Sequence, residues 1–252
     1  MSVFYHHLAD YYDQLFPLNH ASTEFVRSFI TCPESLVLDI GSATGQLAIA
    51  LLERPPANGT VGSVTAMDID EKMVDHLNNK ILLNELQPRL SVVKGGMADI
   101  NLLFKPRTYH LILCLGNTLV HLQTLHEIQD FFHSVHNLLR SGGVFIFQVV
   151  NYTRILTQHI DQLPLIDKPS VSLTREYRYD ETNHLIHFLT RMTVKETNEV
   201  IKNETVLYPL EYHQLVPIIN RIGFDTVTCT GNFNHEPWES NSPALVMALK
   251  KH

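Results

Sequence analysis

The feature that most constrains the fold is a short apolar run that stops at two closely spaced glycines. Leu36–Ile40 is long enough for a buried strand, and Gly41 to Gly45 turn the chain before a helical stretch from Gln46 to Arg54. Helices are also predicted over 71–84 and 125–139, and these alternate with strands predicted at 64–67, 90–93, 110–115 and 144–150. This alternation is typical of a parallel sheet with right-handed helical crossovers.

The pattern changes after about residue 170. Three antiparallel strands are predicted at 172–179, 185–194 and 204–208, followed by a helix over 212–222 and two last strands at 225–230 and 244–249. We therefore predict a single α/β domain over residues 1–252, with a seven-stranded, mostly parallel sheet that ends in an antiparallel hairpin. Its parts are an N-terminal helical segment (1–31), a central core (32–151), a β insertion (170–210) and the end of the sheet (211–252).

Charge and cysteine content limit the partners and the compartment. Nineteen basic and 26 acidic residues give a net charge of −7, so there is no broad basic field for a nucleic-acid backbone. Cys32, Cys114 and Cys229 are too few and too far apart for a zinc site or a disulfide framework. Because no apolar run approaches the length of a membrane span, we expect a cytoplasmic protein without a membrane partner.

Fifteen histidines raise the question of a metal site. His133 and His136 share a helical face, with His121 and His126 upstream, but the sequence has no His-Glu-x-x-His motif. We therefore interpret these histidines as scattered surface residues and predict no metal.

The glycine turn after the first strand indicates a cofactor site. Asp39 and the turn from Gly41 to Gly45 lie at the sheet edge where open α/β folds bind cofactors. A dinucleotide fingerprint requires glycine where Ala43 and Gln46 stand, and a P-loop requires a Gly-Lys-Ser/Thr sequence that is missing. Asp68 ends the second strand, where it is placed to accept the ribose hydroxyls of an adenosine. Taken alone, Asp68 could equally be a solvated acid at the end of a strand. Gly41 and Gly45 at the end of the preceding strand favour the ribose role.

Three motifs resemble those of class I S-adenosylmethionine-dependent methyltransferases: residues 37–45, 67–70 and 138–143. The resemblance implies a Rossmann-like fold, S-adenosylmethionine as cofactor and S-adenosylhomocysteine as product. It also implies contacts to the methionine part, the ribose and the adenine, made by Tyr11, Asp39, Gly41, Ala43, Gly45, Asp68, Ile69, Gly96, Met97, Ala98, Leu115 and Asn117. Two of these depart from the family pattern. Ala43 replaces a frequent glycine, and Gly96 replaces a usual Asp or Asn, so only backbone contact with adenine is expected there.

Later segments resemble glycine and sarcosine N-methyltransferases. The similar segments are Cys114–Leu122, Asn151-Tyr152, Tyr208-Pro209 and Ile222–Phe224. In those enzymes an arginine after the fifth strand binds the carboxylate of the amino acid. Val150 stands at that position here, and Thr153 replaces the acid that follows. Because a buried carboxylate needs a paired cation, we predict that glycine is not the acceptor unless Arg154 or Arg175 supplies the charge.

The acceptor side is open to several interpretations. His121 and Tyr12 are candidate catalytic residues, and Asn117, His121, Arg175 and Tyr177 are candidate substrate contacts. For each, a structural role is the alternative: a helix-start histidine bonded to backbone, a tyrosine docked on the core, or solvated strand side chains. The segment around Tyr11 and Asp13 resembles the N-terminal lid of the family. Positioning dominates methyl transfer, so the sequence needs no nucleophile–base pair.

These observations predict a methyltransferase that acts on a small-molecule acceptor at nitrogen or oxygen. An RNA or protein methyltransferase is one alternative, which the acidic balance disfavours. A non-catalytic protein that binds S-adenosylmethionine or S-adenosylhomocysteine is another, because binding and transfer use nearly the same residues. A monomer and a homodimer are both compatible with the sequence.

Overall fold

A computed structural model describes residues 8–53 and 59–252, so the first residues of the expected N-terminal segment and Arg54, the predicted end of the first core helix, lie outside the described residues. The main sheet has the strand order β10-β11-β5-β4-β1-β2-β3. β11 is antiparallel to both of its neighbours, β5 and β10, while the other pairs are parallel. The strands are β1 (Ser35–Ile40), β2 (Val61–Asp68), β3 (Leu90–Lys94), β4 (Tyr109–Cys114), β5 (Leu139–Val150), β10 (Phe224–Thr230) and β11 (Ala244–Lys251). The predicted Rossmann-like fold is confirmed.

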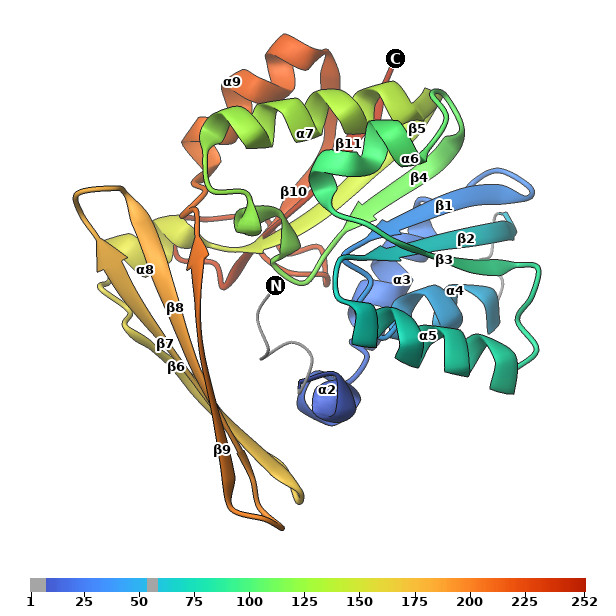
Figure 1. Ribbon diagram of the computed structural model, residues 1–252. Helices are drawn as coiled ribbons and strands as arrows, with labels where there is room; N and C mark the ends of the chain where they lie inside the picture. The colour runs from blue at the N-terminus through green and yellow to red at the C-terminus, as the bar shows by residue number, and fades with distance from the viewer. Residues whose placement is uncertain (1–7, 54–58) are drawn as a thin grey trace.

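Helices cover both faces of this sheet (Figure 1). On one face lie α3 (His20–Ser28), α4 (Gln46–Glu53) and α5 (Glu71–Leu83), and on the other α6 (Ile100–Leu103), α7 (Leu125–Leu138) and α9 (Tyr212–Ile222). Each face has its own apolar core. Phe25, Leu51 and Leu77 belong to the first, and Phe132 and Phe145 to the second. Such a layered burial is what holds a doubly wound sheet together.

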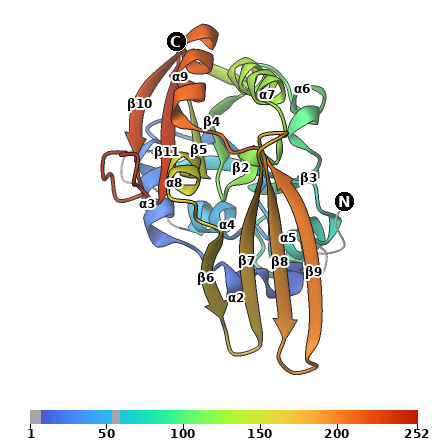
Figure 2. The same ribbon diagram turned by 90° about the vertical axis from the view of Figure 1, so that its left-hand side faces the viewer.

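The β insertion forms a second, four-stranded antiparallel sheet in the order β6-β7-β8-β9. Its strands are β6 (Gln162–Asp167), β7 (Val171–Asp180), β8 (Leu185–Val194) and β9 (Glu199–Leu207). Figure 2 looks onto this sheet and shows it standing in front of the main domain, with α2 (Tyr12–Leu15) behind its β6–β7 half. We call the surface turned toward the main domain the inner face. It packs against the N-terminal segment at one end and against the main core at the other.

The N-terminal segment is broken into short helices rather than one continuous helix. η1 (Ala9–Tyr11) and α2 precede Pro17, and α3 begins after Asn19. The Asn19 side chain accepts hydrogen bonds from the backbone amides of Ala21 and Ser22, which caps α3. Proline and an N-cap asparagine within a few residues of each other explain why the helix is interrupted here.

The structure differs from the predicted elements in several places. β5 begins at Leu139 rather than at residue 144, since Leu139 already pairs with Tyr109 although Gly142 has a φ of +76°. α8 (Tyr152–Thr157) and β6 were not predicted, and β9 begins at Glu199 rather than at residue 204. β6 contains Pro164 and lies at the sheet edge, where proline is tolerated because no partner requires its amide.

Candidate functional site: a cavity at the carboxyl ends of the parallel strands

A cavity of about 240 Å³ opens at the carboxyl ends of β1 and β4. Its walls come from the glycine turn, the N-terminal segment, the chain just after β4, and the side chains of Gln148 and Phe233. Of the residues that the sequence singles out, the cavity is lined by Tyr12, Asp39, Gly41, Ala43 and Leu115. The structure thus gathers these five residues around one space, while Tyr11, Gly45 and Asp68 lie outside its lining.

The glycine turn that forms one wall requires glycine at both of its ends. Gly41 and Gly45 have φ values of +73° and +76°. A Cβ at Gly41 would lie 2.4 Å from the side chain of Thr118, and one at Gly45 would lie 2.3 Å from that of Leu77. Ala43 has a φ of +47° between them, a conformation that costs a non-glycine residue roughly 1–2 kcal/mol. The turn is therefore strained and closely packed against Thr118 and Leu77.

Two carboxyl groups lie at the base of the turn. Asp39 is buried, and burial together with the charge of Asp68 raises its pKa to about 7. Burial also raises the pKa of Asp68, although the backbone amides of Asp70 and Ala43 donate hydrogen bonds of 2.9 and 2.8 Å to its carboxylate. A carboxylate has about four acceptor sites, so Asp68 retains capacity for a ligand hydroxyl.

Ser42 is a cavity residue that the sequence analysis did not single out. Its hydroxyl is buried and has no hydrogen-bond partner within the described ranges. A buried hydroxyl without a partner is unfavourable, so this position suits a ligand with a polar group. The available signal was its place between Gly41 and Ala43 in the turn. Ser42 and the raised pKa of Asp39 together favour a ligand that brings both hydrogen-bonding groups and positive charge.

The predicted adenine residues lie outside the lining of this cavity. Ile69 is 56% exposed, and a Cβ at Gly96 would lie 3.2 Å from its Cδ1 atom. The amide of Gly96 donates to the carboxylate of Asp99 at 3.1 Å, while Met97 is half-buried and Ala98 exposed. Ile69, Gly96 and Met97 thus offer an apolar surface close to the end of β2, where an adenine ring is expected.

Asn117 connects the ends of two strands. It has a left-handed backbone, with φ of +66°. Its amide oxygen accepts from the backbone of Val150 at 2.9 Å, and its amide nitrogen donates to the hydroxyl of Tyr152 at 3.0 Å. His121 lies in η3 (Thr118–His121), where burial lowers its pKa and favours the neutral imidazole. Neither residue lines the cavity, so their predicted contacts with cofactor or substrate stay predictions.

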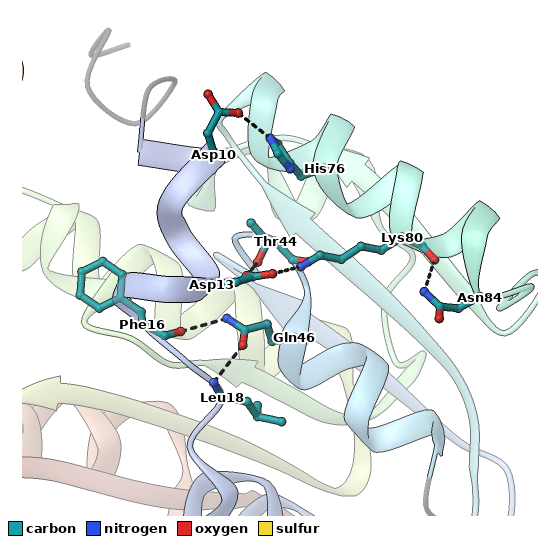
Figure 3. Close-up of polar contacts among 9 residues, drawn as sticks. All are labelled: Asp10, Asp13, Phe16, Leu18, Thr44, Gln46, His76, Lys80 and Asn84. Atoms are coloured by element: carbon teal, nitrogen blue, oxygen red, sulfur yellow. Dashed lines mark hydrogen bonds and ion pairs between the residues drawn. The ribbon is translucent and has the colours of Figure 1, made fainter. Parts of the chain in front are cut away.

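The N-terminal segment is fastened directly to the glycine turn (Figure 3). Asp13 pairs with Lys80 at 2.6 Å and accepts a hydrogen bond from the Thr44 hydroxyl, and Lys80 also donates to the Thr44 carbonyl at 3.0 Å. Gln46 bonds the backbone of Phe16 and Leu18, each at 2.9 Å. The segment therefore lies over the cavity, as a lid would.

The remaining acceptor candidates lie on and near the second sheet. Tyr177 is buried, and this raises the pKa of its hydroxyl to about 12. Arg175 is half-buried and donates to the carbonyl of Pro164 at 2.9 Å. Arg154 bonds Gln158 of its own helix at 3.4 Å. Tyr11 packs among the apolar residues under the second sheet.

Two further observations concern metals and membranes. Among the residues with described coordinates, His, Cys, Asp and Glu side chains form no group of three or more that suits a metal ion. Within the same ranges no helix combines the length and the apolar character that crossing a bilayer requires.

Comparison with known proteins identifies the class. Residues 37–143 match the family model of the methyltransferase domain. This stretch runs from β1 into β5 and contains the glycine turn, Asp39 and Asp68. With this match, the predicted enzyme class, an S-adenosylmethionine-dependent methyltransferase, is confirmed. No curated protein shows significant sequence similarity to the chain.

Solved structures share the complete architecture at low sequence identity. An S-adenosylmethionine-dependent methyltransferase from Clostridium acetobutylicum is 18% identical, with a TM-score of 0.79 over 98% of this chain and 99% of that one. The methyltransferase CcbJ from Streptomyces caelestis is 19% identical, with a TM-score of 0.76 over 97% and 96%. CalS10, an S-adenosylmethionine-bound amino pentose methyltransferase from Micromonospora echinaspora, is 12% identical, with a TM-score of 0.67 over 100% and 98%. The second sheet and the N-terminal segment are thus part of a shared fold.

Proposed function

We propose that the protein transfers a methyl group from S-adenosylmethionine to nitrogen or oxygen of a small molecule other than glycine. The observation that carries this proposal is the buried Asp39 in the cavity wall, beside a glycine turn whose Ser42 hydroxyl has no partner in the described part of the chain. An ammonium group favours the ionised form of a carboxyl whose pKa burial has raised. The amino acid end of S-adenosylmethionine carries such a group.

Different residues bind the three parts of the cofactor. Asp39, Ser42 and the turn from Gly41 to Gly45 hold the methionine part, together with Leu115 and Tyr11. Asp68 accepts the ribose hydroxyls, and the adenine lies on the surface made by Ile69, Met97 and the backbone of 96–98. When bound, the cofactor supplies an electrophilic methyl group on a sulfonium. The protein contributes orientation and the exclusion of water, which together are worth about 7–11 kcal/mol in favourable cases.

Two residues are candidates for handling the acceptor proton. His121 is held neutral by burial, so it can accept a proton near pH 7. Tyr12 lines the cavity from the N-terminal segment and can orient the acceptor. Asn117 lies at the end of β4 and aligns this edge through its bonds to Val150 and Tyr152. A neutral amine acceptor needs no strong base, whereas a hydroxyl acceptor does.

The acceptor differs from glycine because this chain lacks the arginine that binds the glycine carboxylate in glycine and sarcosine N-methyltransferases. Val150 stands at that position. Val150 pairs with Ala244 at the end of β5, and an isopropyl group cannot bind a carboxylate. The glycine and sarcosine subgroup therefore remains a resemblance. Small-molecule acceptors are supported by the amino pentose methyltransferase among the similar structures. We further propose one domain over 1–252, a cytoplasmic location, and a monomer or homodimer.

Calorimetry with S-adenosylmethionine, S-adenosylhomocysteine and NAD tests the cofactor. We expect binding of the first two and not of NAD, and Asp68→Ala should weaken that binding by roughly 1.5–3 kcal/mol for each ribose hydrogen bond lost. Tight binding of NAD alone would refute the proposal. Incubating the protein with methyl-labelled cofactor and a cell extract then separates the alternatives. Label in small metabolites supports the proposal, label in RNA or protein favours a macromolecular acceptor, and no label at all favours a non-catalytic binding protein.

A further inference from the structure

A polar row crosses the inner face of the second sheet. The register pairs Arg175 on β7 with Thr190 on β8, and Thr190 with Asn203 on β9. Two residues further along each strand the same face is apolar. Toward the N-terminal segment it carries Leu173 and Met192, and toward the main core it carries Tyr177 and Phe188. The sheet thus changes from apolar to polar midway between its two packing regions.

Two polar atoms in this row are buried without a hydrogen-bond partner. They are Nε of Arg175 and Oγ1 of Thr190, whose side chains are neighbours across β7 and β8. Thr190 is only 5% exposed. Arg175 donates through Nη2 to the carbonyl of Pro164, and no acidic side chain pairs with it in the described parts of the protein. Groups that are buried in this way need a partner, and a partly desolvated cation needs an anion.

The row lies close to the end of β4. The hydroxyls of Tyr177 and Tyr152 share a hydrogen bond, and Tyr152 accepts one from Asn117. Arg175 precedes Tyr177 by two residues on the same strand, which is a step of about 7 Å. The polar row therefore lies one same-face step along β7 from Tyr177, where this chain of hydrogen bonds begins.

We propose that Arg175 and Thr190 bind an oxyanion, a carboxylate or a phosphate, that belongs to the methyl acceptor. This inference rests on the proposed function, since it takes the end of β4 as the place of methyl transfer. Arg175 as a residue is half-buried, so part of its side chain is exposed, and the oxyanion accepts hydrogen bonds from Arg175 and from the hydroxyl of Thr190. The side chains of Tyr177 and Tyr152 stand between this row and Asn117 at the end of β4, so the position suits an acceptor longer than glycine, whose amine and carboxylate share one carbon.

The test compares acceptor probes in matched pairs that differ by the anionic group. The pairs are 4-aminobutanoate with its amide, 2-aminoethyl phosphate with ethanolamine, and glucosamine 6-phosphate with glucosamine. Binding is measured by calorimetry on the full chain saturated with S-adenosylhomocysteine. We expect at least one anionic member to bind about ten- to hundredfold more tightly than its neutral partner. Arg175→Gln should abolish that preference, and Arg175→Lys should retain part of it.

Arg178→Gln is the matched control. Arg178 lies on the same strand, on the opposite face, where it pairs with the exposed Glu204 at 3.2 Å. This variant should keep the preference. Thr190→Val should reduce the preference about three- to tenfold and leave the unliganded protein equally or more stable, because it removes a buried hydroxyl without a partner.

The outcomes separate the two proposals. Failure of S-adenosylhomocysteine to bind refutes the proposed function and this inference with it. When S-adenosylhomocysteine binds, an absence of anion preference in every pair, or a preference that survives Arg175→Gln, overturns the oxyanion site alone.

Discussion

At the scale of single residues, the buried carboxyl of Asp39 opposes the stability of the protein and serves its proposed ligand. Burial and the neighbouring Asp68 raise its pKa to about 7. The folded-state pKa therefore lies above the unfolded value of 3.8. Its contribution to stability is fully present below the unfolded pKa and is lost as the pH rises through the folded pKa. At pH 8 the unliganded protein thus holds an unfavourable buried charge, as perturbed groups at functional sites commonly do.

The first prediction concerns Asp39→Asn. This variant should be more stable than the wild type at pH 8, by an amount on the order of a few kcal/mol that shrinks toward pH 5. Its affinity for S-adenosylhomocysteine should be low at every pH. In the wild type, affinity should fall roughly tenfold between pH 8 and pH 6, as the ionised fraction of Asp39 falls. Urea unfolding and calorimetry measure both quantities. Asp75→Asn, at an exposed position on α5, is the control, and equal pH profiles for the two variants would contradict the assignment.

The second prediction separates backbone conformation from crowding at Gly41. Gly41 and Gly142 have nearly equal φ values of +73° and +76°, but only Gly41 has a side chain, that of Thr118, where a Cβ would lie. Gly142→Ala should cost about 1–2 kcal/mol from its φ alone. Gly41→Ala should cost a further ~1–3 kcal/mol from overpacking and should abolish cofactor binding.

Thr118→Ala in the background of Gly41→Ala provides the check on this reasoning. It removes the two atoms that a Cβ at Gly41 meets at 2.4 and 2.5 Å, so part of the lost stability should return in urea denaturation. If both alanine variants are destabilised equally and the double variant recovers nothing, crowding by Thr118 is not the reason for glycine at this position.

At the scale of elements, the N-terminal segment is attached to the site by side chains from distant parts of the sequence. Asp13 and Lys80 both bond Thr44, so the segment, α5 and the glycine turn meet at one point (Figure 3). Asp10 makes a second attachment to Lys72 and His76, but these residues lie on α5 and not in the turn. The two carboxylates therefore differ in what they hold.

The third prediction follows from that difference. Asp13→Asn should speed the dissociation of S-adenosylhomocysteine about fivefold, because a partly exposed ion pair is worth at most about 1 kcal/mol. It should also increase hydrogen exchange over residues 8–19. Asp10→Asn should increase exchange near η1 and leave dissociation unchanged. Equal dissociation rates for the two variants, measured by stopped flow, would show that the segment does not act on the turn.

The sequence predicts most of the helices and strands, but only a few of the contacts between them. Periodicity was sufficient for β8 and α9, whose predicted bounds match the structure, because an amphipathic pattern depends only on neighbouring residues. Periodicity misplaced the start of β5. In the sequence Gly142 and Gly143 resemble the end of a helix, and the pairing of Leu139 with Tyr109 depends on a contact between distant residues. Periodicity also missed β6, a proline-containing edge strand that exists because β7 is beside it. The role of Thr44 in holding Asp13 depends on side chains 31 residues apart, which no local pattern encodes.

At the scale of the whole molecule, a small apolar cluster connects four parts that are separate in the sequence. We define the joint cluster as Leu8, Ala9, Leu15, Ala43, Met73, Val171, Leu173 and Met192. These residues come from the N-terminal segment, the glycine turn, α5 and the second sheet. The methyl group of Ala43 therefore has a packing role at a position where glycine would relieve the backbone. The insertion, the lid and the cofactor site are thus expected to order together.

The last prediction tests that coupling with Leu173→Ala. Leu173 is 1% exposed on β7, and truncating a buried leucine typically costs 2–5 kcal/mol. The joint cluster lies between the N-terminal segment, the glycine turn, α5 and the second sheet. The lost stability should therefore appear as local opening where these elements meet. Hydrogen exchange should rise in both the N-terminal segment and β7, and the affinity for S-adenosylhomocysteine should fall since the segment lines the cavity. Leu138→Ala, at an equally buried position on α7 in the main core, should lower global stability and leave the affinity of the folded protein unchanged. If the two variants lose stability and affinity in the same proportion, the lid and the second sheet are not coupled through this cluster.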